Sequence, residues 1–388
     1  MKLSHTKKSV AVFTVAYHPH IWWAEVARRE ISKRVDEIER VFFCAKLDPS
    51  LPCVDTFEWS KIYRIWVWIP SLDKLLFLLF APIIALFCHC RYRFKVSIGI
   101  LAAWWWWAAM LFKMLTLNTV PYILNIQDGD TDEYIDKKVW SFKWFYKMLY
   151  RKPDVISVIS KFLAVRAKTL GYHGEIRHIP NGVDTNKFAI HISESEGYQL
   201  LNWLWRNKEN KVIITTSRLN YKNDIGSIIE SLMYLDDNRV FLCLGEWELR
   251  SSLEKKINDL WLNQRVRMPW YVEHETVAKY MNIADVFCRP SLQEWLWNSF
   301  LEAMSFWIPV VATPVWWIVD FINDGITWFF CNVQDPKSIA IQIRRIVEMN
   351  ENDKATVLSN AKNLVSERYT REIIANVYRD RLSPFMVK

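Results

Sequence analysis

Residues 283–317, IADVFCRPSLQEWLWNSFLEAMSFWIPVVATPVWW, constrain the fold of this chain more than any other stretch. An apolar run at 283–288 predicts a buried strand, and a polar turn that carries Glu294 follows it. A helix is expected from about Asn298, before a second apolar strand at 308–312. Strand, helix and strand within about 30 residues form a βαβ unit, which predicts a parallel sheet. Ligands bind at the carboxyl ends of strands in such sheets, where Glu294 is expected to lie.

The same stretch carries two carboxylates, Glu294 and Glu302, eight residues apart. It resembles the E-x7-E motif of the retaining glycosyltransferases of family 4 (group 1 glycosyltransferases with the GT-B fold), and the resemblance extends over residues 9–382. It implies an α/β protein with two Rossmann-like, parallel-sheet domains that face a central cleft, and a C-terminal helix that crosses back to the first domain. The family has glycine where this chain has tryptophan at positions 295, 297, 307, 316 and 317.

Glycine is scarce in this chain and tryptophan is abundant. A usage of about 7% would give roughly 27 glycines, whereas the chain has 9 Gly and 22 Trp. We interpret the sequence as one in which many motif glycines are replaced by tryptophan; a protein naturally rich in tryptophan is the alternative. Bulky side chains at turns that need glycine cost about 1–3 kcal/mol each, and roughly a dozen of them would exceed a typical stability of about 5–15 kcal/mol. We therefore expect this chain to fold poorly and to be inactive.

The first expected strand, residues 9–17, leads into His18-Pro19-His20-Ile21-Trp22-Trp23-Ala24-Glu25. This segment resembles the Pro-x-x-Gly-Gly-Ala-Glu turn of the family, whose paired glycines let backbone N–H groups approach the donor and the acceptor at a helix N-terminus. The resemblance assigns those two positions to Trp22 and Trp23. His18 and His20 either line the acceptor side or are solvated loop histidines.

A later expected strand, residues 121–126, ends in Gln127-Asp128-Gly129-Asp130. Related glycosyltransferases carry a polar residue in this loop near the donor sugar. The candidates that the resemblance implies here are Gln127, Asp128 and Asp130, and we assign the catalytic role to Asp128. An Asx-rich turn that caps the next helix is the alternative.

The sequence Ile-Pro-Asn-Gly-Val-Asp at 179–184 matches the linker of the family, with Gly182 intact. It marks the end of the first domain. The expected parts are an acceptor-side domain at 1–188, a linker at 189–208, a nucleotide-sugar-binding domain at 209–368 and a C-terminal helix at 369–388.

The strand expected at 211–217 is followed by Arg218 and Lys222. The family has an arginine and a lysine here against the pyrophosphate of the donor. Two fixed cations stabilise the charge that develops on the leaving phosphate, so no metal and no further cofactor is expected. A salt-bridging surface pair is the alternative for these two residues.

Around the two carboxylates the resemblance implies a donor-binding site. Glu294 would hold hydroxyl groups of the donor sugar, and Glu302 would hold the ribose. A capping box of Ser299 and Glu302 at the helix N-terminus is a purely structural alternative, and the two roles can coexist. The further positions that the resemblance assigns to the donor are Trp295, Leu296, Trp297, Asn298, Ser299 and Tyr271.

The formal net charge of +8 and the sequence pI near 9.0 favour an anionic partner such as a nucleotide sugar, a lipid phosphate or an anionic membrane surface. No nucleic-acid recognition motif supports binding to DNA or RNA.

The apolar run at 75–88 has 14 residues, fewer than the about 20 that span a bilayer. With Arg91, Arg93 and Lys95 behind it, the run predicts either an interfacial helix on anionic lipid or a core helix beside solvated charges.

The resulting prediction is a retaining glycosyltransferase of the hexosyltransferase type, which moves a sugar from a UDP-, GDP- or ADP-sugar to a hydroxyl of a glycan or a lipid-linked saccharide. The alternatives are a catalytically dead Gly-to-Trp variant and a membrane-surface binding protein.

Seven cysteines without paired spacing favour a reducing compartment. The basic N-terminus leads into a strand, so no signal peptide is expected. We expect a cytoplasmic protein, either free or peripheral at the inner face of the membrane.

Overall fold

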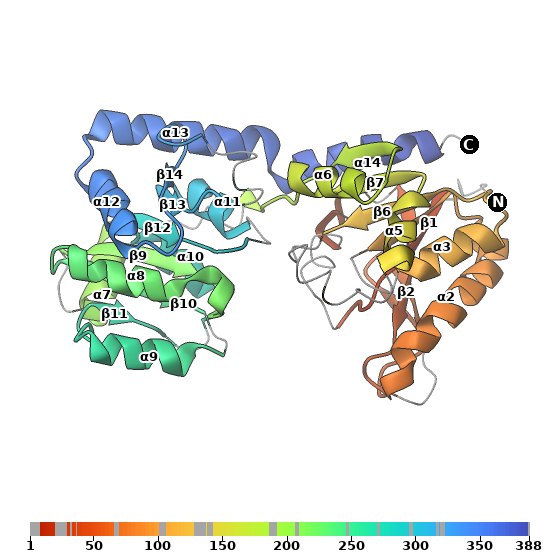
Figure 1. The fold of residues 1–388 in the computed structure, drawn as a ribbon, viewed down its shortest axis with the longest axis horizontal. Helices are drawn as coiled ribbons and strands as arrows, with labels where there is room; N and C mark the ends of the chain where they lie inside the picture. The colour runs from red at the N-terminus through yellow and green to blue at the C-terminus, as the bar shows by residue number, and fades with distance from the viewer. Residues whose placement is uncertain are drawn as a thin grey trace. The chain divides into compact units, whose positions relative to one another are not determined.

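The structure is a computed structural model that describes the chain except for several short segments. These segments are 1–7, 20–28, 32, 36, 66–69, 101–105, 128–136, 138–142, 186–191, 206–208, 246–247, 270–271, 295–297, 316–317, 319–322 and 387–388. The chain divides into two compact units. The first runs to Gly182 and resumes at Arg371, and the second comprises Val183–Thr370 (Figure 1).

These divisions lie a few residues from the ones expected near 188 and 369. The segment expected as a linker, 189–208, differs from that expectation because it contains the helix α7 (Glu194–Trp205). The helix has a buried face formed by Leu201, Leu204 and Trp205, so the segment packs within the second unit.

The first unit is built on an eight-stranded sheet with the order β3-β4-β2-β1-β5-β6-β7-β8. Neighbouring strands are parallel except at the edge, where β3 runs antiparallel to β4. Largely apolar sequences such as YILNI in β6 suit strands that are buried on both faces. The strands are β1 (Lys8–Phe13), β2 (Ile38–Ala45), β3 (Val54–Phe57), β4 (Ser60–Ile65), β5 (Val96–Ile100), β6 (Tyr122–Ile126), β7 (Val155–Val158) and β8 (Glu175–His178).

The described helices that precede the linker sequence are α2 (Pro70–Tyr92), α3 (Trp106–Leu115), α5 (Lys143–Arg151) and α6 (Lys161–Thr169). Helix α6 begins after Ser160, whose Oγ accepts a hydrogen bond from the backbone N of Leu163 at 3.2 Å. The apolar run predicted at 75–88 forms part of α2. Within the described parts of the chain, no helix has the length and apolar character that a membrane span requires.

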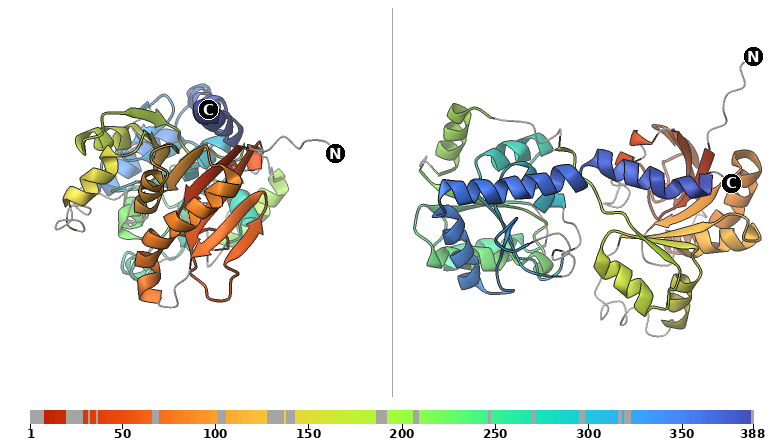
Figure 2. Two further views of the ribbon diagram at one scale, coloured as in Figure 1. Left: turned by 90° about the vertical axis from the view of Figure 1, so that its right-hand side faces the viewer. Right: turned by 90° about the horizontal axis from the view of Figure 1, so that it is seen from above.

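The C-terminal helix α14 (Arg371–Met386) belongs to the first unit, which confirms the predicted crossing helix. Its residues Ile374 and Tyr378 share an apolar core with Val10 of β1 and Ile98 of β5. Figure 2 shows α14 following α13 (Glu351–Arg368), the two blue helices at the end of the chain.

The second unit holds a six-stranded parallel sheet with the order β11-β10-β9-β12-β13-β14. In chain order this is the 3-2-1-4-5-6 arrangement of a Rossmann fold, and β4-β2-β1-β5-β6-β7 repeats it in the first unit. The predicted βαβ unit is confirmed, because β12 pairs in parallel with β13 and α11 (Asn298–Ser305) connects them. The strands are β9 (Lys211–Thr216), β10 (Arg239–Leu244), β11 (Val266–Arg267), β12 (Val286–Arg289), β13 (Val310–Ala312) and β14 (Phe329–Phe330).

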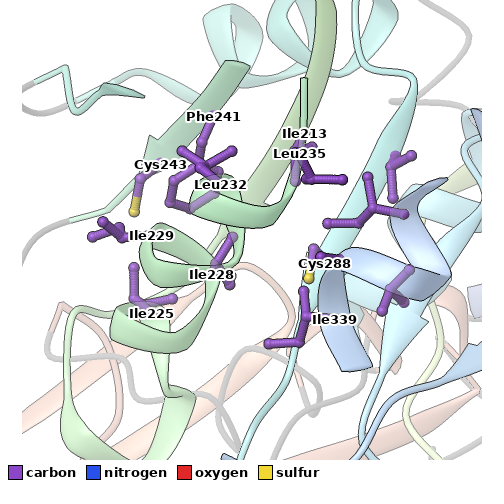
Figure 3. Close-up of a cluster of buried hydrophobic side chains, with 14 of the residues drawn as sticks. Ile213, Ile225, Ile228, Ile229, Leu232, Leu235, Phe241, Cys243, Cys288 and Ile339 are labelled. Atoms are coloured by element: carbon purple, nitrogen blue, oxygen red, sulfur yellow. The ribbon is translucent and has the colours of Figure 1, made fainter. Parts of the chain in front are cut away.

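Apolar side chains of α8 (Ile225–Ser231) close the core of the second unit against its sheet. Ile225, Ile228 and Ile229 share one buried cluster with Ile213 of β9 and Phe241 of β10 (Figure 3). The other described helices of this unit are η3 (Tyr221–Asn223), η4 (Leu232–Tyr234), α9 (Arg250–Asp259), α10 (His274–Asn282) and α12 (Pro336–Val347).

Two tryptophans close helices in a backbone conformation that favours glycine. Trp261 follows α9 with φ of +59°, and Trp307 follows α11 with φ of +58°. Each helix end has the two backbone hydrogen bonds of a Schellman motif, in which the left-handed position is usually glycine. Gly171 closes α6 in the same way, with φ of +94°. This geometry is consistent with glycine having been replaced by tryptophan at the ends of α9 and α11.

Candidate functional site

The strand order of the second sheet places a topological switch point between β9 and β12. From β9 the chain continues on one side through β10 and β11, and β12 then pairs with the other side of β9. Ligands of open α/β sheets bind outside the carboxyl ends of the strands at such a point. The segments that leave this edge are 217–224 after β9 and 290–294 after β12.

Backbone and side-chain hydrogen bonds join these two segments. The backbone N of Leu292 donates to the carbonyl O of Lys222 at 2.7 Å. Asn223 Nδ2 donates to the carbonyl O of Arg218 at 2.7 Å, which fixes the turn between the two predicted cations. The Arg218 side chain is exposed and that of Lys222 is half-buried. The structure therefore brings the predicted Arg218 and Lys222 turn against the loop that carries Glu294.

Gly245 allows β10 to end close to the turn after β9. Its φ is +156°, and a Cβ at this position would lie 1.8 Å from the carbonyl O of Ser217. Such a clash would force the carbonyl O of Ser217 to move. The backbone of Ser217 is held in place, however, because its N donates to the carbonyl O of Leu244 at 2.9 Å. A glycine is thus required at position 245.

Glu294 is buried in a charged cluster, with a relative exposure of 1%. Its Oε1 accepts a hydrogen bond from Arg289 Nη2 at 3.2 Å, and its Oε2 accepts one from Ser291 Oγ at 2.8 Å. Arg289 Nε lies 3.1 Å from the same Oε2. Such partners stabilise a buried carboxylate. The arrangement holds Glu294 in one orientation at the switch point.

Helix α11 begins at Asn298, as the sequence predicts. Ser299 lies inside the helix, and its Oγ accepts a hydrogen bond from Arg289 Nη1 at 2.6 Å. The capping box of Ser299 and Glu302, given above as the structural alternative, needs Ser299 just before the helix, whereas Ser299 stands within the first helical turn. Glu302 is half-buried one turn further along the helix.

The corresponding edge of the first sheet carries aromatic rings. After β1, the Tyr17 ring stacks on Phe42 with centroids 3.8 Å apart, and the His18 ring stacks on Phe57 with centroids 3.5 Å apart. The backbone O of His18 accepts a hydrogen bond from Arg64 Nη2 at 2.6 Å. Burial, helped by the nearby positive charge of Arg29, lowers the pKa of His18. The imidazole is therefore neutral at pH 7.

Several predicted site residues lie outside the described residues: Trp22, Trp23, Asp128, Tyr271, Trp295, Leu296 and Trp297. Their roles stay predictions. Among the side chains that the structure does describe, no group of three or more His, Cys, Asp or Glu residues could hold a metal ion.

Sequence reasoning missed Arg289 and Ser291, which donate hydrogen bonds to Glu294, and Asn223, which accepts one from Arg289. One local signal was present, because Arg289 is a cation at the end of an otherwise apolar strand. Such a residue can equally well be solvated at a strand end. Its partner Asn223 is 66 residues away in the chain, beyond the reach of any local pattern.

Residues 204–363 match a protein family described as glycosyl transferases group 1. An uncharacterized glycosyltransferase of Methanocaldococcus jannaschii is 26% identical over 67% of this chain and 69% of its own length. The alpha-monoglucosyldiacylglycerol synthase of Acholeplasma laidlawii is 23% identical over 53% of this chain and 52% of its own length. The chain thus spans only about half the length of several curated relatives that it matches, such as this synthase.

Solved structures share the fold over nearly the whole chain. The sucrose-phosphate synthase of Thermosynechococcus elongatus has a TM-score of 0.78 at 18% identity and covers 97% of this chain and 100% of its own. HepE of Anabaena, in complex with UDP and glucose, has a TM-score of 0.74 at 17% identity and covers 98% of this chain and 100% of its own. At these identities the likeness shows the fold alone, which is the predicted GT-B arrangement of two Rossmann-like, parallel-sheet domains.

Proposed function

Because this chain belongs over residues 204–363 to the group 1 glycosyl transferases, we propose that it moves a sugar from a nucleoside diphosphate sugar to a hydroxyl acceptor and retains the anomeric configuration. The observation that carries the proposal is the contact between the Arg218 and Lys222 turn and the Glu294 loop, through the 2.7 Å hydrogen bond from Leu292 N to Lys222 O. It assembles two cations and a carboxylate at the switch point, where a phosphorylated ligand of such a sheet binds.

In the proposed reaction Arg218 and Lys222 face the diphosphate of the donor. The bond between the anomeric carbon and the diphosphate oxygen breaks, and the acceptor oxygen forms its bond on the same face of the sugar. The two cations stabilise the negative charge that develops on the leaving phosphate. That phosphate takes the proton of the acceptor hydroxyl. Glu294 accepts a hydrogen bond from the donor sugar, and Glu302 accepts one from the ribose.

The donor that we propose first is a UDP-sugar, with GDP- and ADP-sugars as the alternatives. Support comes from the fold shared with HepE of Anabaena, which is described in complex with UDP-glucose. The acceptor that we propose is a glycan or a lipid-linked saccharide. Relatives described as a capsular polysaccharide biosynthesis glycosyltransferase and as an alpha-monoglucosyldiacylglycerol synthase support that class.

Binding to UDP-, GDP- and ADP-glucose, measured by thermal shift and calorimetry, tests this function. We expect one of the three to bind, and Arg218→Ala to weaken its binding about 100-fold or more, because a fixed cation at the diphosphate is lost. Arg368→Ala, which removes an exposed arginine at the end of α13, is the matched control and leaves binding unchanged. Unaltered donor binding in Arg218→Ala would contradict the proposal.

The catalytically dead variant remains the competing hypothesis, and the same assay separates it. If the chain binds none of the three donors, a variant in which Trp22, Trp23, Trp295 and Trp297 are all replaced by glycine is compared with it. Binding that appears only in this variant means that the tryptophans have abolished an ancestral activity. No binding in either protein removes the transferase proposal.

We also propose that the first unit acts at an anionic membrane surface, because α2 exposes an apolar stripe. Leu79, Ile83 and Phe87 recur every four residues, and Phe87 is 75% exposed. The stripe leads to the exposed cations Arg91 and Arg93, so an apolar face and a positive charge meet at one end of the helix. This pattern is typical of helices that lie in the headgroup region of anionic bilayers.

Co-sedimentation with phosphatidylglycerol vesicles and with phosphatidylcholine vesicles tests membrane association. We expect binding to the anionic vesicles, a strong reduction in Phe87→Ser and a reduction by added salt. Val165→Ser is the matched control, since Val165 is an exposed apolar residue on α6 of the same unit. Equal sedimentation of the Phe87→Ser variant would refute the stripe as the docking surface. Vesicle binding without any response to nucleotides would favour a membrane-surface binding protein instead of a transferase.

A further inference from the structure

The buried guanidinium of Arg289 connects three segments of the candidate site. Nη1 donates to Ser299 Oγ at 2.6 Å, in the first turn of α11. Nη2 donates to Glu294 Oε1 at 3.2 Å, in the loop after β12, and to Asn223 Oδ1 at 3.3 Å, in the turn after β9. Asn223 in turn donates to the carbonyl O of Arg218 at 2.7 Å. One side chain thus links the carboxylate to the backbone of the predicted phosphate-binding arginine.

Burial makes this link rigid. Arg289 is 9% exposed, Asn223 is 5% exposed and Glu294 is 1% exposed, so water does not compete for these hydrogen bonds. Arg289 also ends the strand β12, and its backbone is held in register with Ala312 of β13. A planar guanidinium whose backbone is fixed in a sheet presents its donors in a set geometry.

We propose that Arg289 is a positioning residue for donor recognition: it aims Glu294 at the sugar of the donor and keeps the Arg218 turn in register with that carboxylate. The proposal rests on the proposed function. We assign Arg289 a positioning role because its terminal nitrogens donate to Ser299, Asn223 and Glu294.

The physical reason for such a residue lies in the position of Glu294. Without such partners, a carboxylate with so little exposure would not keep one orientation, and the acceptor that a sugar hydroxyl needs would be misplaced. Arg289 and Ser291 satisfy part of the hydrogen-bonding capacity of the Glu294 carboxylate, and each of its oxygens can accept more than one hydrogen bond.

A positioning role predicts a loss that depends on the sugar. We compare the affinity for UDP-glucose with the affinity for UDP, and do the same for the GDP and ADP pairs, so that the ratio isolates the contribution of the sugar. In Arg289→Gln we expect that ratio to fall about tenfold, because a neutral amide cannot hold three partners at once. Arg289→Lys keeps the charge but not the fork, and an intermediate ratio is expected.

The matched control is Arg239→Gln. Arg239 is another buried arginine of the same sheet, 9% exposed, but it is the first residue of β10 and so lies at the amino ends of the strands. Its Nη2 lies 3.4 Å from Asp236 Oδ2. Its loss lowers the melting temperature and leaves the ratio unchanged. If Arg289→Gln does not fold, Ser299→Ala removes a single partner of the guanidinium, and we expect it to lower the same ratio several-fold.

The outcomes separate this inference from the function on which it rests. If the unaltered chain binds no nucleotide and no nucleotide sugar, the proposed function fails and the inference fails with it. If the unaltered chain prefers the nucleotide sugar and a folded Arg289→Gln keeps the same preference, only the inference is overturned. A folded Arg289→Gln that loses the preference, while Arg239→Gln keeps it, supports the positioning role.

Discussion

The two sheets share a six-strand order, yet different side chains follow their central strands. After β9 of the second sheet come Arg218 and Lys222, beside a buried carboxylate and guanidinium. After β1 of the first sheet come Tyr17 and His18, each stacked on a phenylalanine ring. The same topological position is therefore ionic in one unit and aromatic in the other.

Under the proposed function, this difference would divide the labour between two copies of one architecture. The diphosphate of a donor needs fixed cations, which Arg218 and Lys222 would supply at the switch point of the second unit. The uncharged sugar of the proposed acceptor needs flat surfaces and neutral hydrogen-bonding groups. Because its pKa is lowered by burial and then by Arg29, His18 can offer such a neutral group at pH 7. The fold alone assigns neither role, since both sheets have the same order.

The largest effect that would sharpen this comparison is on stability at the ionic edge. Glu294→Ala leaves the Arg289 guanidinium buried without its carboxylate, and we expect a loss of about 3–5 kcal/mol in the free energy of unfolding. His18→Ala at the aromatic edge removes a stacked, half-buried ring, and about 1 kcal/mol is expected. Urea denaturation of the two variants measures both values. Similar losses at the two edges would mean that the second switch point is not organised around its buried ion pair.

Most elements of the second unit could be predicted because its strands are continuous apolar runs separated by clear turns, as in Val240–Leu244 before Gly245. The strands β2 to β5 were not predicted. The sequence IERVFFCA of β2 fits a buried helix as well as a strand, and β3 pairs with β4 through a hairpin that no strong turn residue announces. The carboxylates Glu294 and Glu302 were found from their spacing in the chain. The partners of Glu294 were not, because hydrogen bonds between segments far apart in sequence leave no local pattern.

Helix ends provide a second comparison between the units, because α6 ends on a glycine and α9 ends on a tryptophan. A Cβ at Gly171 would lie 2.7 Å from Arg151 Nε, and the backbone there has φ of +94°. Gly171→Ala is therefore expected to lower the free energy of unfolding by about 1–2 kcal/mol, through left-handed strain and the displaced arginine. Thermal unfolding followed by circular dichroism measures the change. A neutral effect would show that this helix end tolerates a side chain without strain.

The converse change at the end of α9 has the opposite sign. Trp261 is 89% exposed with φ of +59°, so Trp261→Gly relieves left-handed strain and removes few contacts. The added flexibility of glycine in the unfolded chain offsets part of the gain, and we expect a stabilisation of about 0.5–1 kcal/mol. Trp203→Gly is the matched control, since Trp203 is 70% exposed within α7. There glycine costs about 1 kcal/mol of helix stability. If both Trp261→Gly and Trp203→Gly stabilised the protein, relief of left-handed strain at the end of α9 would not be the cause of the gain.

The smallest expected effect concerns pH and contrasts the buried ion pair of the second unit with a more exposed one in the first. Glu30 Oε2 lies 2.7 Å from Arg371 Nη1 and 3.1 Å from Arg34 Nη1, and these contacts tie α14 to the first unit. Burial raises the pKa of Glu30, but the nearby guanidinium groups of Arg371 and Arg34 outweigh it, and the folded-state pKa is lowered. The ionised form therefore favours folding. Its contribution is present above the ordinary glutamate pKa of about 4.3 and is lost as the pH falls through the lower folded-state value.

Because the Glu30 pair is partly screened by solvent, we expect this contribution to be only about 0.5 kcal/mol. The free energy of unfolding, measured in urea at pH 7 and at pH 3.5 or below, should fall by that much more in the unaltered chain than in Glu30→Gln. The difference should shrink when salt is added, since screening weakens partly exposed pairs more than buried ones. A difference that is absent at low salt, or one that salt leaves unchanged, would contradict the account of Glu30 as a screened ion pair.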